Sequence, residues 1–152
     1  INFIDAQGNY LLKEWFDWVG PFKAGLAKVQ RSDKKYNYIG EDGKLLSDEW
    51  FVCVGYFIDG FAVVERTNGE CNFIDKNGKI LSDEWFMYVY DFKDGFAVVK
   101  NEDCVYNFID KNGKILSKQW FNDVYSFNNG FAKVKITNGK WCKIDKTGKL
   151  WK

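Results

Sequence analysis

Histidine is absent from the sequence. This absence removes the commonest general base, the usual nitrogen ligand of metal ions, and the Ser-His and Cys-His nucleophile systems. No glycine-rich loop of the P-loop or dinucleotide-binding type occurs, and the cysteines show no zinc-ligand spacing. We therefore expect no catalytic residues, no metal site and no cofactor, and we interpret the chain as a non-enzyme.

The sequence also lacks an excess of charge of either sign and any long hydrophobic run. Its 22 basic and 21 acidic residues give a formal net charge of +1, and they alternate as on a solvated surface. Nothing in this pattern favours a nucleic-acid partner. Since no stretch is apolar enough to span a membrane, we expect a soluble protein without membrane insertion.

Cysteine is sparse, and its positions follow no pattern. The four cysteines fall at unrelated points of the repeat described below, at Cys53, Cys71, Cys104 and Cys142. We interpret them as free, partly buried thiols that fill core positions, which slightly favours a cytoplasmic location over secretion. The sequence opens at Ile1, without a signal peptide and in the middle of a repeat. This predicts a fragment of a longer array or a processed chain.

What the sequence does contain is a tandem repeat. The phrase Asn-Phe-Ile-Asp-Lys-Asn-Gly-Lys-Ile-Leu-Ser occupies residues 72–82 and recurs unchanged at 107–117, and looser copies begin at Asn2, Asn37 and Cys142. Successive copies start 35 residues apart without insertion or deletion. Such units bury their apolar faces against their neighbours rather than around one centre.

The repeat sets the predicted domain organisation. We expect one repeat domain over residues 1–152. Its predicted parts are a partial copy at 1–25, full units at about 26–60, 61–95 and 96–130, and a terminal unit at 131–152.

Each unit is predicted to be an all-β, three-strand meander. Strand-forming residues precede Asp75 and Gly78, which suit a type I turn followed by a left-handed glycine with a bulge. Residues 79–81 then begin a return strand, and 96–99 forms a further strand. The dipeptides Asn68-Gly69 and Asn138-Gly139 predict type I′ hairpin turns between these strands.

An aromatic connector, with a short strand around Val89, links each unit to the next. Some connector positions are constant, and we interpret them as core because identical units need identical residues where they stack. The constant positions are Trp15, Trp50, Trp85 and Trp120, and Phe22, Phe57, Phe92 and Phe127.

Two architectures fit these units: an open solenoid of stacked β units and a small closed β-propeller. A propeller blade usually has four strands and about forty residues or more, so the observed unit is short for a blade. In the last copy, Cys142-Lys143 replaces Asn-Phe, which gives that unit a more polar outer face. An open array needs such an end, and we therefore favour the solenoid.

The pattern resembles the WG β-repeat family of bacterial proteins. The resemblance rests on an aromatic residue, a small polar residue, Phe-Ile-Asp, a glycine turn and Phe-Asp-x-Val-x-x-Phe-x-x-Gly-Phe-Ala-x-Val, and it covers essentially the whole chain. Trp141 keeps the family's tryptophan, but Asn37, Asn72, Asn107 or Cys142 stands where the family has glycine. The resemblance implies a bacterial protein with repeated β-hairpins, an interaction role and no defined catalytic residues.

The repeated acidic residues resemble two kinds of chemical site. The aspartates Asp5, Asp75, Asp110 and Asp145 resemble the opening of a calcium loop, but the position for the bidentate acid, counted from Asp75, is Phe86. The pairs Asp48-Glu49 and Asp83-Glu84 resemble acid–base dyads, but they recur with the repeat, whereas an active site occurs once. We interpret the former as turn caps and the latter as exposed connector residues.

The aromatic residues at variable connector positions are the best functional lead. Variable side chains on a constant scaffold are how repeat proteins encode a binding surface, although local packing also accounts for them. The candidate interaction residues are Trp18, Tyr56, Tyr88, Tyr90 and Tyr125. They predict a non-catalytic module for protein–protein interaction or scaffolding; the alternative is a carbohydrate- or cell-wall-binding aromatic module, whose partner would be a glycan.

Overall fold

The computed structural model describes residues 1–152 and contains strands but no helices. Short strands and longer hairpin strands alternate along the chain. The short strands are β1 (Trp18–Val19), β4 (Cys53–Val54), β7 (Tyr88–Val89), β10 (Asp123–Val124) and β13 (Leu150–Trp151). The longer strands are β2 (Leu26–Gln30), β3 (Tyr36–Gly40), β5 (Phe61–Glu65), β6 (Cys71–Asp75), β8 (Phe96–Lys100), β9 (Tyr106–Asp110), β11 (Phe131–Lys135) and β12 (Trp141–Asp145).

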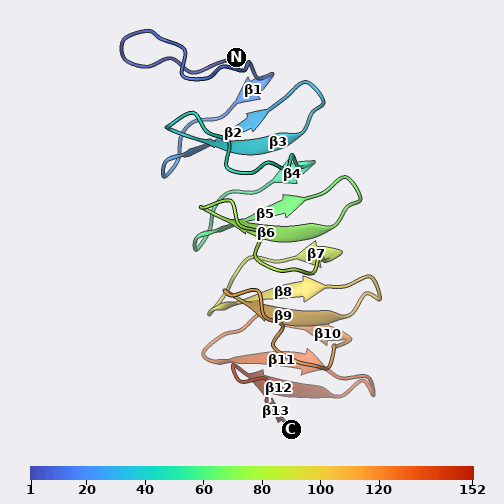
Figure 1. Cartoon of the computed structure of the whole chain (residues 1–152). Helices are drawn as coiled ribbons and strands as arrows, with labels where there is room; N and C mark the ends of the chain where they lie inside the picture. Colours follow the sequence, from blue (N-terminus) through green and yellow to red (C-terminus); the bar gives the residue numbers. More distant parts are fainter.

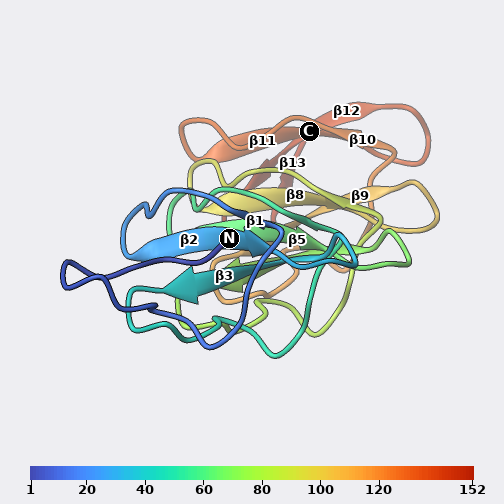
Figure 2. The same cartoon turned by 90° about the horizontal axis from the view of Figure 1, so that it is seen from above.

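These strands form four separate antiparallel sheets that follow one another along an open stack. Their orders are β1-β2-β3, β4-β5-β6, β7-β8-β9 and β10-β11-β12-β13. The two termini lie at opposite ends of the stack (Figure 1), and the view from above shows the first sheets lying in front of the last (Figure 2). The predicted open solenoid is therefore confirmed, and the array does not close into a propeller.

Within each sheet, the alternation of side chains explains the burial. In β8, Ala97 and Val99 point to one face and are fully buried, and they lie opposite Ile109 and Asn107 of β9. Val98 points to the other face, opposite Phe108, and both are also buried. Interior strands are thus covered on both faces, because a neighbouring sheet packs on each side.

The turn of the repeated phrase has the predicted geometry. The Gly78 amide donates to the Asp75 carbonyl at 3.1 Å, and Gly78 is left-handed with φ of 85°. The Asp75 carboxylate accepts hydrogen bonds from the amides of Asn77 and Lys79. The regular return strand predicted after this turn is wrong for the interior copies, where it is reduced to one bridge such as Ile74–Ile80. The third strand of each sheet is instead the short connector strand, such as β7.

The predicted type I′ turn at Asn68-Gly69 is also wrong. Only Gly69 has positive φ there, and its amide bonds to the Arg66 carbonyl as in a type I turn. The reason is loop length, since the register pairs Glu65 with Cys71 and leaves a loop too long for a two-residue turn. Type I′ geometry occurs at Asp59-Gly60, where both residues have positive φ.

A buried asparagine ties each connector to the phrase strand. The side-chain amide of Asn72 donates to the carbonyls of Ser82 at 2.8 Å and Glu84 at 3.0 Å, and its Oδ1 accepts from the amides of Phe73 and Ser82. Asn107 makes all the corresponding bonds and Asn37 makes all but the one from the serine amide, and all three asparagines are 0% exposed. These bonds hold the return segment where no strand ladder holds it.

The phrase turn also sets the distance between units. A Cβ at Gly78 would lie 2.0 Å from the carbonyl oxygen of Leu46, and one at Gly113 would lie 2.1 Å from that of Leu81. Each Leu is in the unit before the glycine. The turn of one unit therefore rests directly on the backbone of the preceding unit, where no side chain fits.

We expect Asn72→Ala to lower the free energy of unfolding by about 3 kcal/mol, because buried backbone groups of Phe73, Ser82 and Glu84 lose their partner. Urea unfolding followed by circular dichroism measures this change. The control is Asn122→Ala, an exposed residue for which a change within about 0.5 kcal/mol is expected. An Asn72→Ala variant as stable as this control would contradict the assigned role.

Gly78→Ala and Gly69→Ala form a matched pair, since both glycines have φ of 85°. A Cβ at Gly69 meets nothing within 4 Å, so that substitution is expected to cost only about 1–2 kcal/mol of left-handed strain. We expect Gly78→Ala to be further destabilising, by at least about 2 kcal/mol, because the Cβ clashes with the Leu46 carbonyl. Equal unfolding free energies for the two variants would refute the inter-unit contact.

Candidate functional site

The variable aromatic residues lie on or beside the short connector strands. Trp18 and Tyr88 begin β1 and β7 and lie opposite Gln30 and Lys100. The residue two positions later lies on the same side of the connector, and it differs between units. Gly20 lies under the indole of Trp18, whereas Tyr90 packs against Tyr88 with ring centroids 4.9 Å apart. The Trp18 ring therefore packs over a glycine, whereas the Tyr88 ring packs against a second aromatic ring.

All five predicted interaction residues are exposed. Their exposed fractions are 42% for Trp18, 65% for Tyr56, 52% for Tyr88, 45% for Tyr90 and 61% for Tyr125. The structure brings Tyr88 and Tyr90 into contact, but it places the others in separate positions along the array. Cys53 and Asp123 occupy the Tyr88 position in the second and fourth sheets, so the aromatic row is interrupted.

Tyr56 is engaged by two lysines rather than by another aromatic ring. The Lys28 Nζ lies 3.7 Å from the ring centroid and that of Lys23 lies 4.8 Å from it. Lys28 also donates to the Val54 carbonyl at 2.9 Å. Burial lowers the pKa of Lys28 below its ordinary value. The Lys28 side chain thus connects the first sheet to the second by its hydrogen bond to Val54, and the Tyr56 ring packs against its ammonium group.

The constant tryptophans do not fill the core, which corrects the prediction in part: Trp50, Trp85 and Trp120 pack against its edge. Trp15 is 64% exposed, and Trp50, Trp85 and Trp120 are only half-buried. The buried positions are the phenylalanines that follow them, such as Phe86, whose backbone pairs with Cys71 and whose side chain faces inward. The other constant position is better predicted, since Phe92 and Phe127 are buried, although Phe22 and Phe57 are half-buried.

Arginines cover two of these tryptophans and border a groove. The guanidinium of Arg31 lies 4.6 Å from the Trp50 ring centroid, and that of Arg66 lies 3.6 Å from the Trp85 centroid. Arg66 also donates to both carboxylate oxygens of Glu49, at 2.7 and 3.1 Å. The groove has a volume of about 540 Å³, and its lining residues are Arg31, Lys35, Asp48, Glu49, Trp50, Arg66, Thr67 and Asn68.

The repeated acidic residues have structural partners. Glu49 of the first acidic pair is half-buried in its ion pair with Arg66, so it is not a simple exposed residue, while Asp83 and Glu84 are exposed. Asp145 accepts from the Thr147 hydroxyl and from Nε1 of Trp151, and these bonds hold its pKa well below the usual range. No cluster of three or more cysteine, aspartate or glutamate residues is placed to hold a metal ion.

The sequence model of the family described as "WG containing repeat" matches residues 3–36, 73–103 and 108–141, which is well over half of the chain. The chain belongs to the WG containing repeat family. Its three matched segments show that the copies of the repeat are copies of the family's unit. No curated protein matches the chain.

Solved structures similar to this WG-repeat chain are distant in sequence. The computationally designed Ika8 protein has 16% identity and a TM-score of 0.46, with 96% of this chain and 52% of that chain covered. The designed Ika4 protein has 15% identity, a TM-score of 0.44 and coverages of 95% and 98%. The WD40 β-propeller domain of Doa1 has 13% identity, a TM-score of 0.42 and coverages of 95% and 57%. The chain spans about half the length of Ika8, and these TM-scores are too low to carry an argument about closure.

The asparagine in this WG-repeat chain explains its departure from the family's dipeptide. Asn72 and its equivalents occupy the slot of the family's glycine, and their side chains fill it with hydrogen bonds to the connector. In the last copy this slot holds Cys142, which is buried. The dipeptide is thus replaced by a polar anchor in the interior copies.

The cysteines of the WG-repeat chain divide into two classes, which corrects the expectation that all fill core positions. Cys71 and Cys142 are buried, whereas Cys53 and Cys104 are exposed, and all four thiols are free. Burial raises the pKa of Cys71 to about 11. As a separate matter, the structure contains no helix that is long and apolar enough to cross a membrane.

At pH 8 we expect iodoacetamide to alkylate Cys53 and Cys104 in the native protein and to leave Cys71 and Cys142 unmodified. The thiolate is the reactive form, and a thiol whose pKa is raised to about 11 stays protonated at pH 8. Peptide mapping by mass spectrometry distinguishes the sites, and labelling in denaturant is the control. Native labelling of Cys71 at the rate of Cys53 would contradict the described burial.

Proposed function

We propose that the chain is a non-catalytic repeat module that binds a partner protein through the connector aromatics. The observation that carries this proposal is the exposure of Trp18, Tyr88 and Tyr90 at variable positions of a constant scaffold. Tyrosine and tryptophan are enriched at protein interfaces because they bury a large rigid surface at low entropic cost. Local packing does not account for the 42% to 52% of these aromatic residues that is left in water.

Several features support a binding role over a catalytic one. The sequence has no histidine, and the acidic residues that repeat act as turn caps or ion-pair partners. Tyr88 and Tyr90 support each other at 4.9 Å, so little rotamer entropy would be lost on binding. A nucleic-acid partner stays outside the proposal, since the net charge is only +1.

The second candidate is glycan binding, which the groove at Trp50 favours. Its lining combines one half-buried aromatic ring with amide, carboxylate and guanidinium groups, including Asn68 and Asp48. Ligand sites typically combine apolar or aromatic walls with a few placed polar groups. This groove lies on residues other than Trp18, Tyr88 and Tyr90, so the two candidates are separable by mutation.

The test is an affinity capture from lysate and wall fractions of the source organism, with the wild type and a Trp18→Ala/Tyr88→Ala/Tyr90→Ala variant. Any captured protein is then purified and titrated by calorimetry. We expect the triple variant to bind at least about thirtyfold more weakly, because one hot-spot aromatic contributes about 2 kcal/mol. The matched control is Tyr10→Ala/Trp15→Ala, which removes exposed aromatics elsewhere.

The outcomes separate the candidates. A purified partner that binds the control variant normally and the triple variant weakly supports the protein-binding function. Retention on wall polysaccharide that is lost in Trp50→Ala supports the glycan instead. Unchanged affinity of the triple variant, with native circular dichroism, rejects the connector aromatics as the binding surface.

A further inference from the structure

The outer face of the fourth sheet differs from the equivalent faces of the interior sheets. In the second and third sheets, the central cross-strand pairs on this face are Val63–Phe73 and Val98–Phe108. In the fourth sheet the same pair is Lys133–Lys143, and both lysines are exposed. This confirms the more polar outer face predicted for the terminal copy.

The row that contains these lysines crosses β11, β12 and β13 and reaches Tyr125, the residue that follows β10. The Tyr125 amide donates to the Lys133 carbonyl at 2.9 Å, Lys133 pairs with Lys143, and Lys143 pairs with Trp151. Two lysines therefore lie between two aromatic residues. Trp141, at 40% exposure, extends this aromatic border and lies 5.4 Å from Tyr125 between ring centroids.

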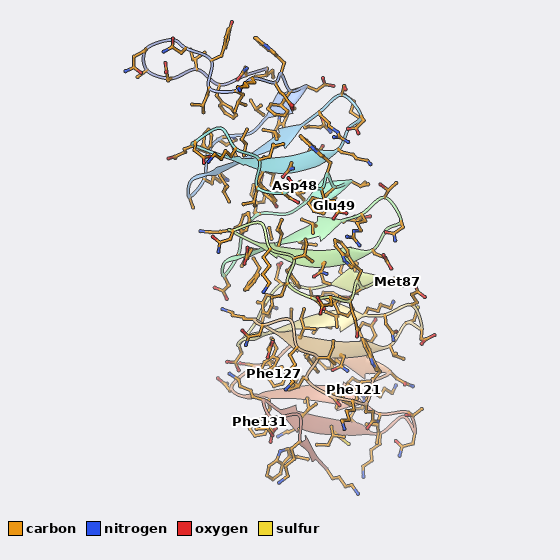
Figure 3. The ribbon with its side chains drawn as sticks, in the orientation of Figure 1. Asp48, Glu49, Met87, Phe121, Phe127 and Phe131 are labelled. Atoms are coloured by element: carbon orange, nitrogen blue, oxygen red, sulfur yellow. The ribbon has the colours of Figure 1, made fainter.

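On the interior sheets, a phenylalanine from the following sheet packs on the equivalent face. Phe92, which follows β7 of the third sheet, lies 5.1 Å from Phe61 and 4.9 Å from Phe73 of the second sheet, measured between ring centroids. Phe127 lies 4.6 Å from Phe96 and stacks on it. Phe131 holds the Phe96 position on the fourth sheet, but it is exposed and lies near the C-terminal end of the stack (Figure 3). The face thus keeps one of the two ring contacts for an incoming aromatic side chain, at Phe131, while Lys143 stands at the position of Phe73.

The lysines and aromatics line one open concavity of about 1590 Å³. Its lining includes four lysines and no aspartate or glutamate; the lysines are Lys93, Lys133, Lys143 and Lys152. A concave surface lined by one sign of charge concentrates a ligand of the opposite sign. The net charge of the whole chain is only +1. The positive charge of this concavity is therefore a local feature of the terminal face and not a property of the whole surface.

We propose that the terminal face binds an acidic, phenylalanine- or tyrosine-bearing peptide segment of a partner protein. In an extended segment, side chains two residues apart point to the same side. An aromatic residue of the segment stacks on Phe131, and a carboxylate two residues away pairs with Lys133 and Lys143. This surface is separate from Trp18, Tyr88 and Tyr90, so it goes beyond the function proposed above.

A second copy of the chain fits this face less well. The large exposed side chains at the opposite end of the array include Ile1, Ile4 and Tyr10. Stacking that end on the fourth sheet would bury Lys133 and Lys143, which lie directly opposite each other, against apolar groups. Burying like charges without partners is strongly unfavourable. An acidic segment neutralises both lysines and still supplies an aromatic ring.

The experiment uses a fluorescein-labelled synthetic peptide in which Phe and Glu alternate at the inward positions and Ser fills the others. Fluorescence anisotropy measures its binding to the wild type. We expect saturable binding that weakens as salt is raised, and at least about tenfold weaker binding to K133E/K143E. The K133Q/K143Q variant, which removes charge without reversing it, should fall between them.

The matched control is K79E/K114E, which makes the same charge change on exposed lysines outside the concavity. It should bind within about twofold of the wild type. Peptides with Ser in place of Glu, or with Ser in place of Phe, should bind at least several-fold more weakly. The lysines of both variants are exposed, so circular dichroism should show native folding in each.

The proposal is overturned by any of several results. These are no anisotropy change with the wild type at about millimolar peptide, equal binding by K133E/K143E, or tighter binding of an oligothymidylate of matched length. Self-association of the wild type that K133E/K143E abolishes would show that a second copy occupies the face. None of these results bears on the triple aromatic variant, so the two proposals fail independently.

Discussion

The buried asparagine of each interior unit is the constraint on which the array depends. Interior copies have little regular strand after the phrase turn, since only a bridge such as Ile74–Ile80 remains. The amide of Asn72 replaces the missing ladder by bonding two carbonyls of the return segment. Buried polar groups must be paired, so this side chain fixes where the connector starts. The connector in turn places Phe86 in the core and Tyr88 at the surface.

This arrangement separates the residues that stabilise the stack from those free to vary. Phe86, Val99 and Ile109 lie between sheets and are fully or almost fully buried. Trp18 and Tyr88 lie on the same strand position but outside that packing, where Cys53 and Asp123 are also tolerated. A substitution at this position changes the surface without changing the spacing of the units. A repeat scaffold of this kind can acquire new partners while its fold is kept.

Local chemistry explains which parts of the structure could be predicted. The turn at Asp75 and Gly78 was predictable because a carboxylate cap and a left-handed glycine define it without distant contacts. The turn at Gly69 was not, because strand register decides its length. Periodicity indicated that Trp50 is constant but not which side it faces, and its cover, Arg31, lies at a variable position. The five aromatic residues at variable connector positions are all exposed. Phe131 could not be identified in this way, because it repeats a position that is half-buried in the interior copies, Phe61 and Phe96.

The contact between Gly78 and the Leu46 carbonyl has a consequence for how such a gene can change in length. Because each turn rests on the backbone of the unit before it, inserting or deleting a residue within the turn would move the glycine away from this contact and place a side chain there. Duplication or loss of one whole 35-residue unit restores every such contact, as the unbroken spacing of the copies illustrates. The contact therefore favours changes of array length by whole repeats over insertions within the turn.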